Sequence, residues 1–513
     1  MKKRFTLCVI TNAAVMIFLS VYAFLVPAGM TMHNLRDPGL YSDKMPRFVY
    51  GWHRALSPKY EKWARSHVES KAATKLSTSN ISGTEWPVFG SVFYLWATEA
   101  IQEAYDENPK LSSSAPKEYA RGAIEQAAAL VADPNHASWV KDHWGESYLE
   151  KENLFYRMLL ISGLTSYQKL TGDKKYQELL QSQVESLSKE LDESPYGLLD
   201  DYPGQCYPVD ILPAIAAIRR ADKVLGTDHR KFAARAIRGF QDTRLDQETG
   251  LPAYFVNSKT GFAQDSSRGV GLSFMLIWAP ELWPETAQDW YTKYEEHFWQ
   301  QGRLFAGFRE YPRDVDLGWF ALDDVDAGPV IGGYGAAACA FGIGATRAMG
   351  RFDHAYALES EALVAIWSLS NGTLLGPRFL SNLSDAPYLG EASVLFAFTR
   401  MPVNRKIVPE NVRMPGFVYI GIFLFIFLGC IGILAAIFKT RRILKSEFLT
   451  YASTVRKQFS IWLVLMIAAV MIWMTLSVSI GLIFLLMAQL LPFGLRKQPN
   501  PTKNDSYIPT SKA

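Results

Sequence analysis

The feature that most constrains this chain is a repeat of helical pairs between Pro58 and Met401. Apolar residues recur there with helical spacing, and a more apolar first helix alternates with a mixed second helix. The first helices are predicted to begin at intervals of about 60 residues, near Glu85, Ser147, Pro208, Arg268, Gly328 and Gly390. Such even spacing predicts one structural unit used repeatedly.

The second helices of the pairs are amphipathic, as helices on an outer layer must be. We expect them at Pro116–Val131, Lys174–Leu191, His229–Gln241, Thr286–Gln301 and Phe352–Ser368. The helix Pro58–Leu76 is available to close the sixth pair beside Gly390–Arg400. The predicted fold is therefore all-α, an (α/α)6 barrel of two concentric helix rings. The same period also allows an open helical solenoid.

Three strongly apolar regions lie outside the repeat. Leu7–Val26 and Phe417–Phe438 each have the length of one membrane span. The run from Phe459 to Phe493 is longer, so it predicts either two short spans or one tilted span. Lysines and arginines next to the first two spans predict a cytoplasmic amino terminus and export of the large segment between them.

These regions divide the chain into four parts. We expect an N-terminal anchor (1–28), an exported barrel (29–415), a C-terminal membrane region (416–495) with a basic cytoplasmic loop (439–458), and a disordered tail (496–513). This organisation predicts an inner-membrane protein in contact with the lipid bilayer, its large domain on the periplasmic side. A formal net charge of +3 argues against a nucleic-acid partner.

Three aspartates, Asp323, Asp324 and Asp326, come directly before a Gly-Pro step and a run of small apolar residues. The run predicts a buried helix with Pro329 in its first turn, where a missing N–H costs nothing. One acid there would be explained as a helix cap. Three are more than capping needs, so this stretch is a candidate for chemistry.

Parallel inner helices would bring the loops that precede them to one mouth of the barrel, so we expect their polar and aromatic side chains to share a site. Carboxyl groups crowded in such a site separate their pKa values, and one acts as an acid while another acts as a base. For any single residue, a cap or a packed ring is the commoner explanation. The candidates for substrate binding are Glu85, Trp86, Trp144, Glu152, Asn153, Tyr156, Tyr202, Asp210, Arg268, Trp319 and Glu391.

Other motifs point away from nucleotide or metal chemistry. The glycines of Gly332–Gly335 and Gly342–Gly344 are predicted to lie within a helix as close-packing positions. The histidines show no metal-ligand spacing, so no metal and no cofactor is expected. Cys206 and Cys339 both fall in the exported part; the spacing does not say whether they pair.

Several segments resemble the linalool dehydratase/isomerase family across roughly residues 144–350. They are Glu150–Tyr156, Gly163-Leu164, Tyr167–Gly172, Gly197–Leu199 with Gln205-Cys206, and Arg309-Glu310 with Asp323–Asp326. The resemblance implies an (α/α)6 barrel and cofactor-free removal or addition of water at an allylic terpene alcohol. It also implies paired cysteines, a histidine, a tyrosine and an aspartate at the site. Cys206 matches the second cysteine, whereas Asp200 stands in place of the first and Leu159 in place of the histidine.

The resulting hypothesis is a membrane-anchored hydro-lyase or isomerase acting on a hydroxylated isoprenoid or lipid-borne substrate. Asp323, Asp324 or Asp326 would protonate the leaving hydroxyl. Asp200, Cys206 or Glu146 would take up a proton. Two alternatives stay open: a glycoside hydrolase or polysaccharide lyase acting on envelope glycans, and a non-catalytic receptor or structural protein of the envelope.

Overall fold

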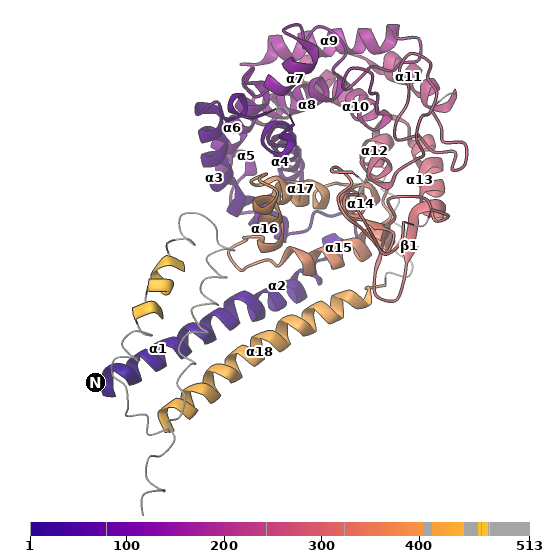
Figure 1. Cartoon of the computed structure of the whole chain (residues 1–513). Helices are drawn as coiled ribbons and strands as arrows, with labels where there is room; N and C mark the ends of the chain where they lie inside the picture. The colour runs from indigo at the N-terminus through magenta and orange to yellow at the C-terminus, as the bar shows by residue number, and fades with distance from the viewer. Residues whose placement is uncertain are drawn as a thin grey trace, which may run out of the picture. The chain divides into compact units, whose positions relative to one another are not determined.

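The computed structural model describes residues 2–77, 79–242, 244–315, 317–322, 324–403, 413–445, 460–462, 464–469 and 471. They form two compact units, one comprising the residues up to Val26 and from Leu424 onward, the other comprising Pro27–Phe423. The chain is mostly helical with a few short strands (Figure 1), as its helical periodicity predicts.

Six apolar helices form the inside of the larger unit. They are α4 (Ile81–Glu107), α8 (Leu154–Thr171), α10 (Pro208–Leu225), α12 (Gly269–Leu282), α14 (Ala336–Ala348) and α17 (Leu389–Phe398). Each packs against the next in chain order and α17 packs against α4, so their contacts form a closed cycle (Figure 1). α12 is buried from Gly269 to Pro280 because neighbours cover it on every side.

Amphipathic helices pack around this cycle: α3 (Phe48–Glu69), α6 (Arg121–Ala132), α9 (Gln177–Glu193), α11 (Arg230–Asp242), α13 (Pro284–Phe298) and α15 (Phe352–Ile366). α9 shows the pattern, because Leu180, Val184, Leu187 and Leu191 are buried on one stripe. The predicted closing helix does contact α17 and also α6. It begins at Phe48, ten residues before the predicted Pro58 start, and Pro58 lies inside it.

Shorter elements connect these helices: η2 (Pro38–Leu40), η3 (Ala72–Lys75), η4 (Pro109–Leu111), α5 (Pro116–Tyr119), α7 (Ser138–Trp144) and α16 (Leu375–Leu383). The predicted helix start near Ser147 is wrong. α7 ends at Trp144, and Glu152 and Asn153 adopt positive φ of 45° and 52°, so α8 begins only at Leu154.

Five short strands also precede α14. β1 (Trp299–Gln301) and β2 (Ala306–Phe308) form one hairpin, and β3 (Phe320–Ala321), β4 (Val330–Ile331) and β5 (Tyr334–Gly335) form a small antiparallel sheet. The prediction of a helix from Pro329 is therefore wrong, as is the placement of Gly332–Gly335 within it. Gly332 and Gly333 take φ of 58° and 88°, turning β4 back onto β5.

The prediction for the second glycine group is confirmed. Gly342 and Gly344 lie in α14. A Cβ atom at Gly342 would come within 2.7 Å of the Phe308 ring, so only a glycine permits this helix to approach β2 so closely.

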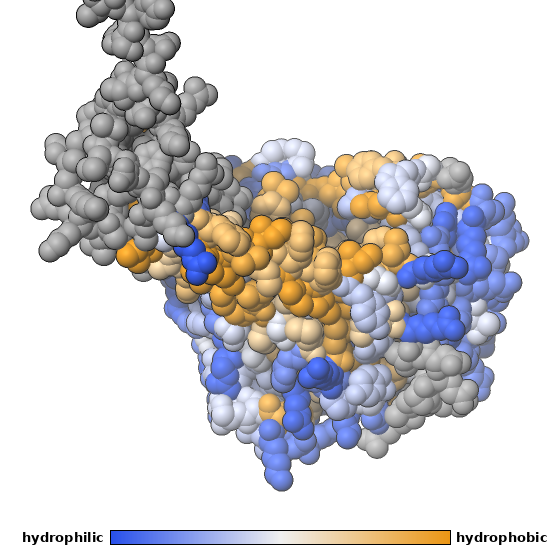
Figure 2. All heavy atoms as spheres, turned by 90° about the horizontal axis from the view of Figure 1, so that it is seen from below, coloured by the Kyte–Doolittle hydropathy of each residue, from blue (hydrophilic) through white to orange (hydrophobic). Residues whose placement is uncertain are grey.

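Among the described residues, two helices are long and apolar enough to cross a membrane. The first runs through α1 (Lys2–Ser20), a π-helical turn (Val21–Leu25) and α2 (Val26–Asn34), the wide turn directly preceding Pro27, which has no N–H to donate. The second is α18 (Gly416–Lys445). Hydrophobic side chains form a broad band in the face shown in Figure 2. Of the predicted third run, the structure describes residues 460–462, 464–469 and 471, which are helical. The tail 496–513 lies outside the described residues.

Aromatic side chains fill the centre of the inner cycle. Trp96 of α4 and Trp278 of α12, helices that are not neighbours in the cycle, have ring centroids 4.6 Å apart. Phe93 packs on Phe396 of α17 at 4.8 Å, and Phe274 on Phe341 of α14 at 5.1 Å. We call these six aromatic residues, whose rings meet across the interior of the inner cycle, the aromatic plug.

Candidate active site

Near the amino-terminal ends of the inner helices, three carboxyl groups lie close enough for their charges to change one another's pKa. Glu85 lies in α4, Asp210 in the first turn of α10, and Asp326 in the turn between β3 and β4. The charge of Asp326 raises the pKa of both other residues, and Glu85 raises the pKa of Asp210. We call Glu85, Asp210 and Asp326 the acid cluster.

Burial is the main reason why these acids resist ionisation. It raises the pKa of Glu85 to about 7, although the Tyr202 hydroxyl donates a hydrogen bond of 2.6 Å to Glu85 Oε2. Burial followed by the charge of Asp324 raises the pKa of Asp326 to about 6. The pKa of Asp210 is raised well above its ordinary value by burial and then by Asp326 and Glu85. Near neutral pH the acid cluster therefore contains both protonated and ionised carboxyl groups.

Asp326 combines two properties that a reacting acid needs. Solvent reaches its side chain, which is exposed. Protein atoms nevertheless crowd around the carboxyl group closely enough to raise its pKa by desolvation. A small molecule approaching from solvent can thus meet a carboxyl group with a perturbed proton affinity.

Asp324 holds the turn on which Asp326 lies. Its Oδ1 accepts a 2.8 Å hydrogen bond from the Asp326 N–H, and its Oδ2 accepts a 2.9 Å bond from Arg268 Nη1. The Tyr254 hydroxyl lies 3.4 Å from the same Oδ2. With all of these donors, Asp324 is a positioning residue, not a free acid.

Arg268 is in turn fixed from its other side. Its Nε donates to Glu310 Oε1 at 3.1 Å, and the guanidinium lies 4.6 Å from the Tyr254 ring centroid. Arg268 Nη2 is buried and has no hydrogen-bond partner among the described residues. Arg268 thus offers one further donor beside the acid cluster.

Asp200 and Cys206, two of the three predicted proton acceptors, are buried within the protein. Asp200 is buried, its carbonyl accepts the Leu154 N–H at 3.1 Å, and its Oδ2 accepts the Gly204 N–H at 2.7 Å. It therefore fixes the start of α8. Cys206 is fully buried, and burial followed by the charges of Asp201 and Asp200 raises the pKa of its thiol far above the usual range. Cys206 and Cys339 are both free thiols.

Glu146, the third predicted acceptor, lies at the surface. Its side chain is 86% exposed and forms an ion pair of 3.1 Å with Lys141. Asp323 lies outside the described residues. Of the residues predicted to carry the chemistry, Asp326 is the one that the structure gives both solvent access and a raised pKa.

Some of the other predicted binding residues lie in the candidate site, and the rest lie in the protein around it. Tyr202, Asp210 and Arg268 belong to the site, as described above. Several others pack or hydrogen-bond in the surrounding wall. These are Trp144, whose Nε1 donates to the Asp201 carbonyl; Glu152, whose N–H donates to Glu190; Asn153, which donates to the Tyr148 carbonyl; Tyr156, which donates to the Val131 carbonyl; and Glu391, which accepts from Arg378 and Ser381. Trp86 is half-buried and Trp319 is exposed.

Sequence reasoning missed Tyr254 and Glu310 as parts of this site. Glu310 is fully buried, and burial raises its pKa to about 7. Tyr254 lies in the long loop between α11 and α12, well before the helix start that the repeat marks. It lies in the apolar loop stretch 251–256, where an aromatic ring does not distinguish a site residue from a packed one.

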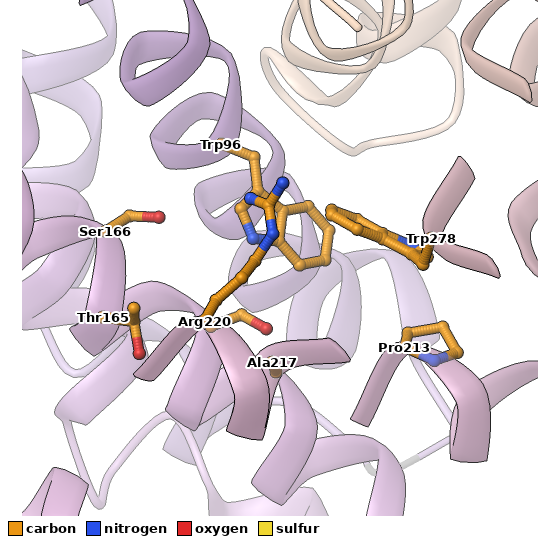
Figure 3. A pocket seen from close by; sticks show the side chains of 8 residues that line it. Trp96, Thr165, Ser166, Pro213, Ala217, Arg220 and Trp278 are labelled. Atoms are coloured by element: carbon orange, nitrogen blue, oxygen red, sulfur yellow. The ribbon is translucent and has the colours of Figure 1, made fainter. Parts of the chain in front are cut away.

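A small cavity lies between the later turns of α4, α8, α10 and α12, with room for about one water molecule. Trp96, Ser162, Thr165, Ser166, Pro213, Ala217, Arg220 and Trp278 line it (Figure 3). None of these is an acid, and Arg220 is held by Glu281 and stacked over Trp278 at 4.9 Å. The lining thus offers no acid/base pair, and the acid cluster remains the candidate active site.

No protein-family model matches this chain, and no curated protein matches it. Among the residues that the structure describes, no group of three or more His, Cys, Asp or Glu side chains is arranged to hold a metal ion.

Proposed function

We propose that this chain is a membrane-anchored enzyme that performs acid/base chemistry without a cofactor, as a hydro-lyase or isomerase on a hydroxylated and largely apolar substrate. The observation that carries this proposal is the acid cluster, whose members have unequal proton affinities. The half-buried rings of Phe89 and Phe341, at the edge of the aromatic plug, offer an apolar surface for such a substrate. An isoprenoid alcohol fits these properties.

The architecture supports the same proposal. The closed cycle of inner helices and the amphipathic helices around it favour an (α/α)6 barrel. The two long apolar helices favour a membrane protein. Lysines and arginines at residues 2–4 and 439–442 favour a multi-pass inner-membrane protein whose larger unit is periplasmic.

In the proposed reaction, Asp210 donates its proton to the substrate hydroxyl, the C–O bond breaks, and water leaves. Asp326 removes a proton from the neighbouring carbon, and the C–H electrons form the new double bond. Asp326 then returns that proton to Asp210 through solvent, so alcohol is converted to alkene plus water. The sequence predicted the proton donor to be Asp323, Asp324 or Asp326. The electrostatics favour Asp210 as the donor and Asp326 as the base, because Asp326 is exposed and lies near Arg268, whereas burial and then two neighbouring acids raise the pKa of Asp210.

Dehydration by the solubilised full-length chain tests this proposal. Asp210→Asn and Asp326→Asn variants are incubated with allylic terpene alcohols and envelope lipids, and loss of water is followed by mass spectrometry. We expect each variant to lose about 100-fold or more of the activity. The matched control is Glu146→Gln, which removes an exposed carboxylate and should leave the rate unchanged. Equal rates in all four proteins would refute the proposal.

A glycoside hydrolase is the second candidate, because carboxyl groups of unequal pKa and an exposed Trp319 ring are also what a sugar-cleaving site requires. The same variants distinguish the two activities. A hydrolase would release new reducing ends from envelope glycans in an Asp326-dependent manner and would leave the alcohols unchanged.

A further inference from the structure

Large apolar side chains are exposed on the segment that carries the acid cluster's Asp326. Trp319 is 77% exposed and Leu322 is 65% exposed, and the same stretch exposes Phe320, Val325 and Ile331. Together with Leu304 and Phe305 at the end of the β1–β2 hairpin, we call these seven residues the apolar strip. Clustered exposed side chains of this size usually mark a surface that is covered in the working protein.

The apolar strip is continuous with the start of a candidate membrane helix. The Phe305 ring lies 5.0 Å from the Phe417 ring of α18, and the Phe417 N–H donates to the Leu304 carbonyl at 2.9 Å. The first residues of α18 and the hairpin end therefore lie together. Since α18 is apolar enough to enter a membrane from Gly416 onward, Leu304 and Phe305 lie beside that point of entry.

The strip continues from the hairpin end to the acid-bearing turn. The Tyr334 hydroxyl donates to the Phe305 carbonyl at 3.1 Å. Tyr334 pairs with Ile331, and Ile331 pairs with Phe320 in the β3–β4–β5 sheet. Asp326 is in the connection between β3 and β4. Contacts thus join the beginning of α18 to the turn that presents Asp326.

We propose that the apolar strip lies in the interfacial layer of the membrane that α18 enters, so that the acid-bearing turn faces lipid. Trp side chains favour that layer, and Phe and Leu side chains occur on the apolar faces of segments that lie in it. Arg303 and Arg413 are exposed close to Leu304 and Gly416, where they suit anionic headgroups. Contact of the apolar strip with the membrane does not depend on the proposed reaction.

Quenching by spin-labelled lipid tests the proposal in the full-length chain. Leu322→Cys is labelled with an environment-sensitive fluorophore in a background in which Cys8 and Cys430 are serine, and the protein is placed in lipid nanodiscs. The matched control is Lys189→Cys on α9, which is also exposed. Nitroxide carried near the lipid headgroup should quench the label at position 322 and leave the label at 189 unaffected. No substrate is present, so the result is independent of activity.

Two outcomes would overturn the proposal. Equal quenching at positions 322 and 189 would show that the strip is not selectively in lipid. If a second copy of the chain covers the strip instead, the emission at position 322 will shift with protein concentration in detergent, and nitroxide lipid will not quench it. A serine substitution at Trp319 and Phe320 adds a check, because it should weaken quenching at 322 while the protein remains folded.

Discussion

At the scale of single residues, the site depends on one charge acting on another. Asp324 accepts hydrogen bonds from Arg268 and from the Asp326 N–H, and its negative charge opposes ionisation of Asp326. The Asp324 carboxylate thus positions Asp326 and also raises its proton affinity.

Replacing Asp324 by asparagine therefore tests this electrostatic role. Asp324→Asn keeps the shape of the turn but removes the charge that raises the pKa of Asp326 and leaves Arg268 to lower it. We expect the pKa of Asp326 to fall from about 6 toward its ordinary value. The acid limb of the pH–rate profile of kcat/KM should move to lower pH. An unchanged limb would show that Asp326 does not act as the base.

Cys206 is expected to be chemically inert. Its thiol is fully buried, and burial and neighbouring acids disfavour the thiolate, which is the reactive form. Iodoacetamide at mildly alkaline pH should modify Cys206 only after unfolding, as measured by mass spectrometry. Cys206→Ala should keep the activity of the unmodified chain. Rapid alkylation of the folded protein would contradict this expectation.

At the scale of helices and strands, the sequence predicted the repeat well and the turns poorly. Helical periodicity located the inner and outer helices because burial of an apolar stripe dominates their pattern. The predicted helix boundaries were wrong where the backbone conformation of single residues determines the structure. Gly332 and Gly333 form a hairpin turn, and Glu152 and Asn153 take left-handed conformations that composition does not reveal. For the candidate site, Asp326 was predicted from the three aspartates before a Gly-Pro step and Asp210 from the loops of the repeat. Tyr254 was not predicted, because it lies away from any helix start.

The packing of α3 against α4 should make stability depend on pH. His53 is fully buried, with its ring nitrogens 2.8 Å from the Tyr119 and Thr98 hydroxyl oxygens. Burial, and then the charge of Arg54, lower its pKa to about 3. The unfolded histidine titrates near its usual pKa of about 6.5, so the unfolded state binds more protons between these values. This contribution is full above pH of about 6.5 and is lost as the pH falls toward about 3.

Chemical denaturation at several pH values measures this effect. The free energy of unfolding of the unmodified chain should decrease from pH 7 to pH 4 more steeply than that of His53→Phe. The variant is expected to be less stable at pH 7, because the Thr98 and Tyr119 hydroxyls lose their partner. The difference in slope is therefore the informative quantity, and parallel slopes would exclude His53 as the cause.

At the scale of the whole molecule, one buried ion pair ties distant parts of the larger unit together. Arg347 and Glu359 are both fully buried and lie 2.8 Å apart. Arg347 also donates to the carbonyls of Gly39, Lys44 and Arg400. It therefore joins α14 and α15 to the segment that follows α2 and to the end of the inner cycle.

Removing Arg347 alone should be costly. Arg347→Met leaves Glu359 buried without its counter-ion, and we expect a loss of about 3–5 kcal/mol in the free energy of unfolding. The double variant Arg347→Met with Glu359→Gln should recover part of that loss, because no charge stays buried. Denaturant titration of all three proteins gives the coupling. A double variant less stable than either single one would show that the backbone hydrogen bonds of Arg347 matter more than the pair.

Trp96 and Trp278 meet at the centre of the inner cycle. Their contact affects how a small molecule could move along the axis of the larger unit. A ring of helices with an open axis would let molecules enter at one end and depart at the other. Here the Trp96 and Trp278 rings meet across the axis, so a molecule that approaches Asp326 from solvent would leave at the same end of the helices. In the proposed reaction, substrate and product would therefore use the same opening, and slow release of the product would delay binding of the next substrate.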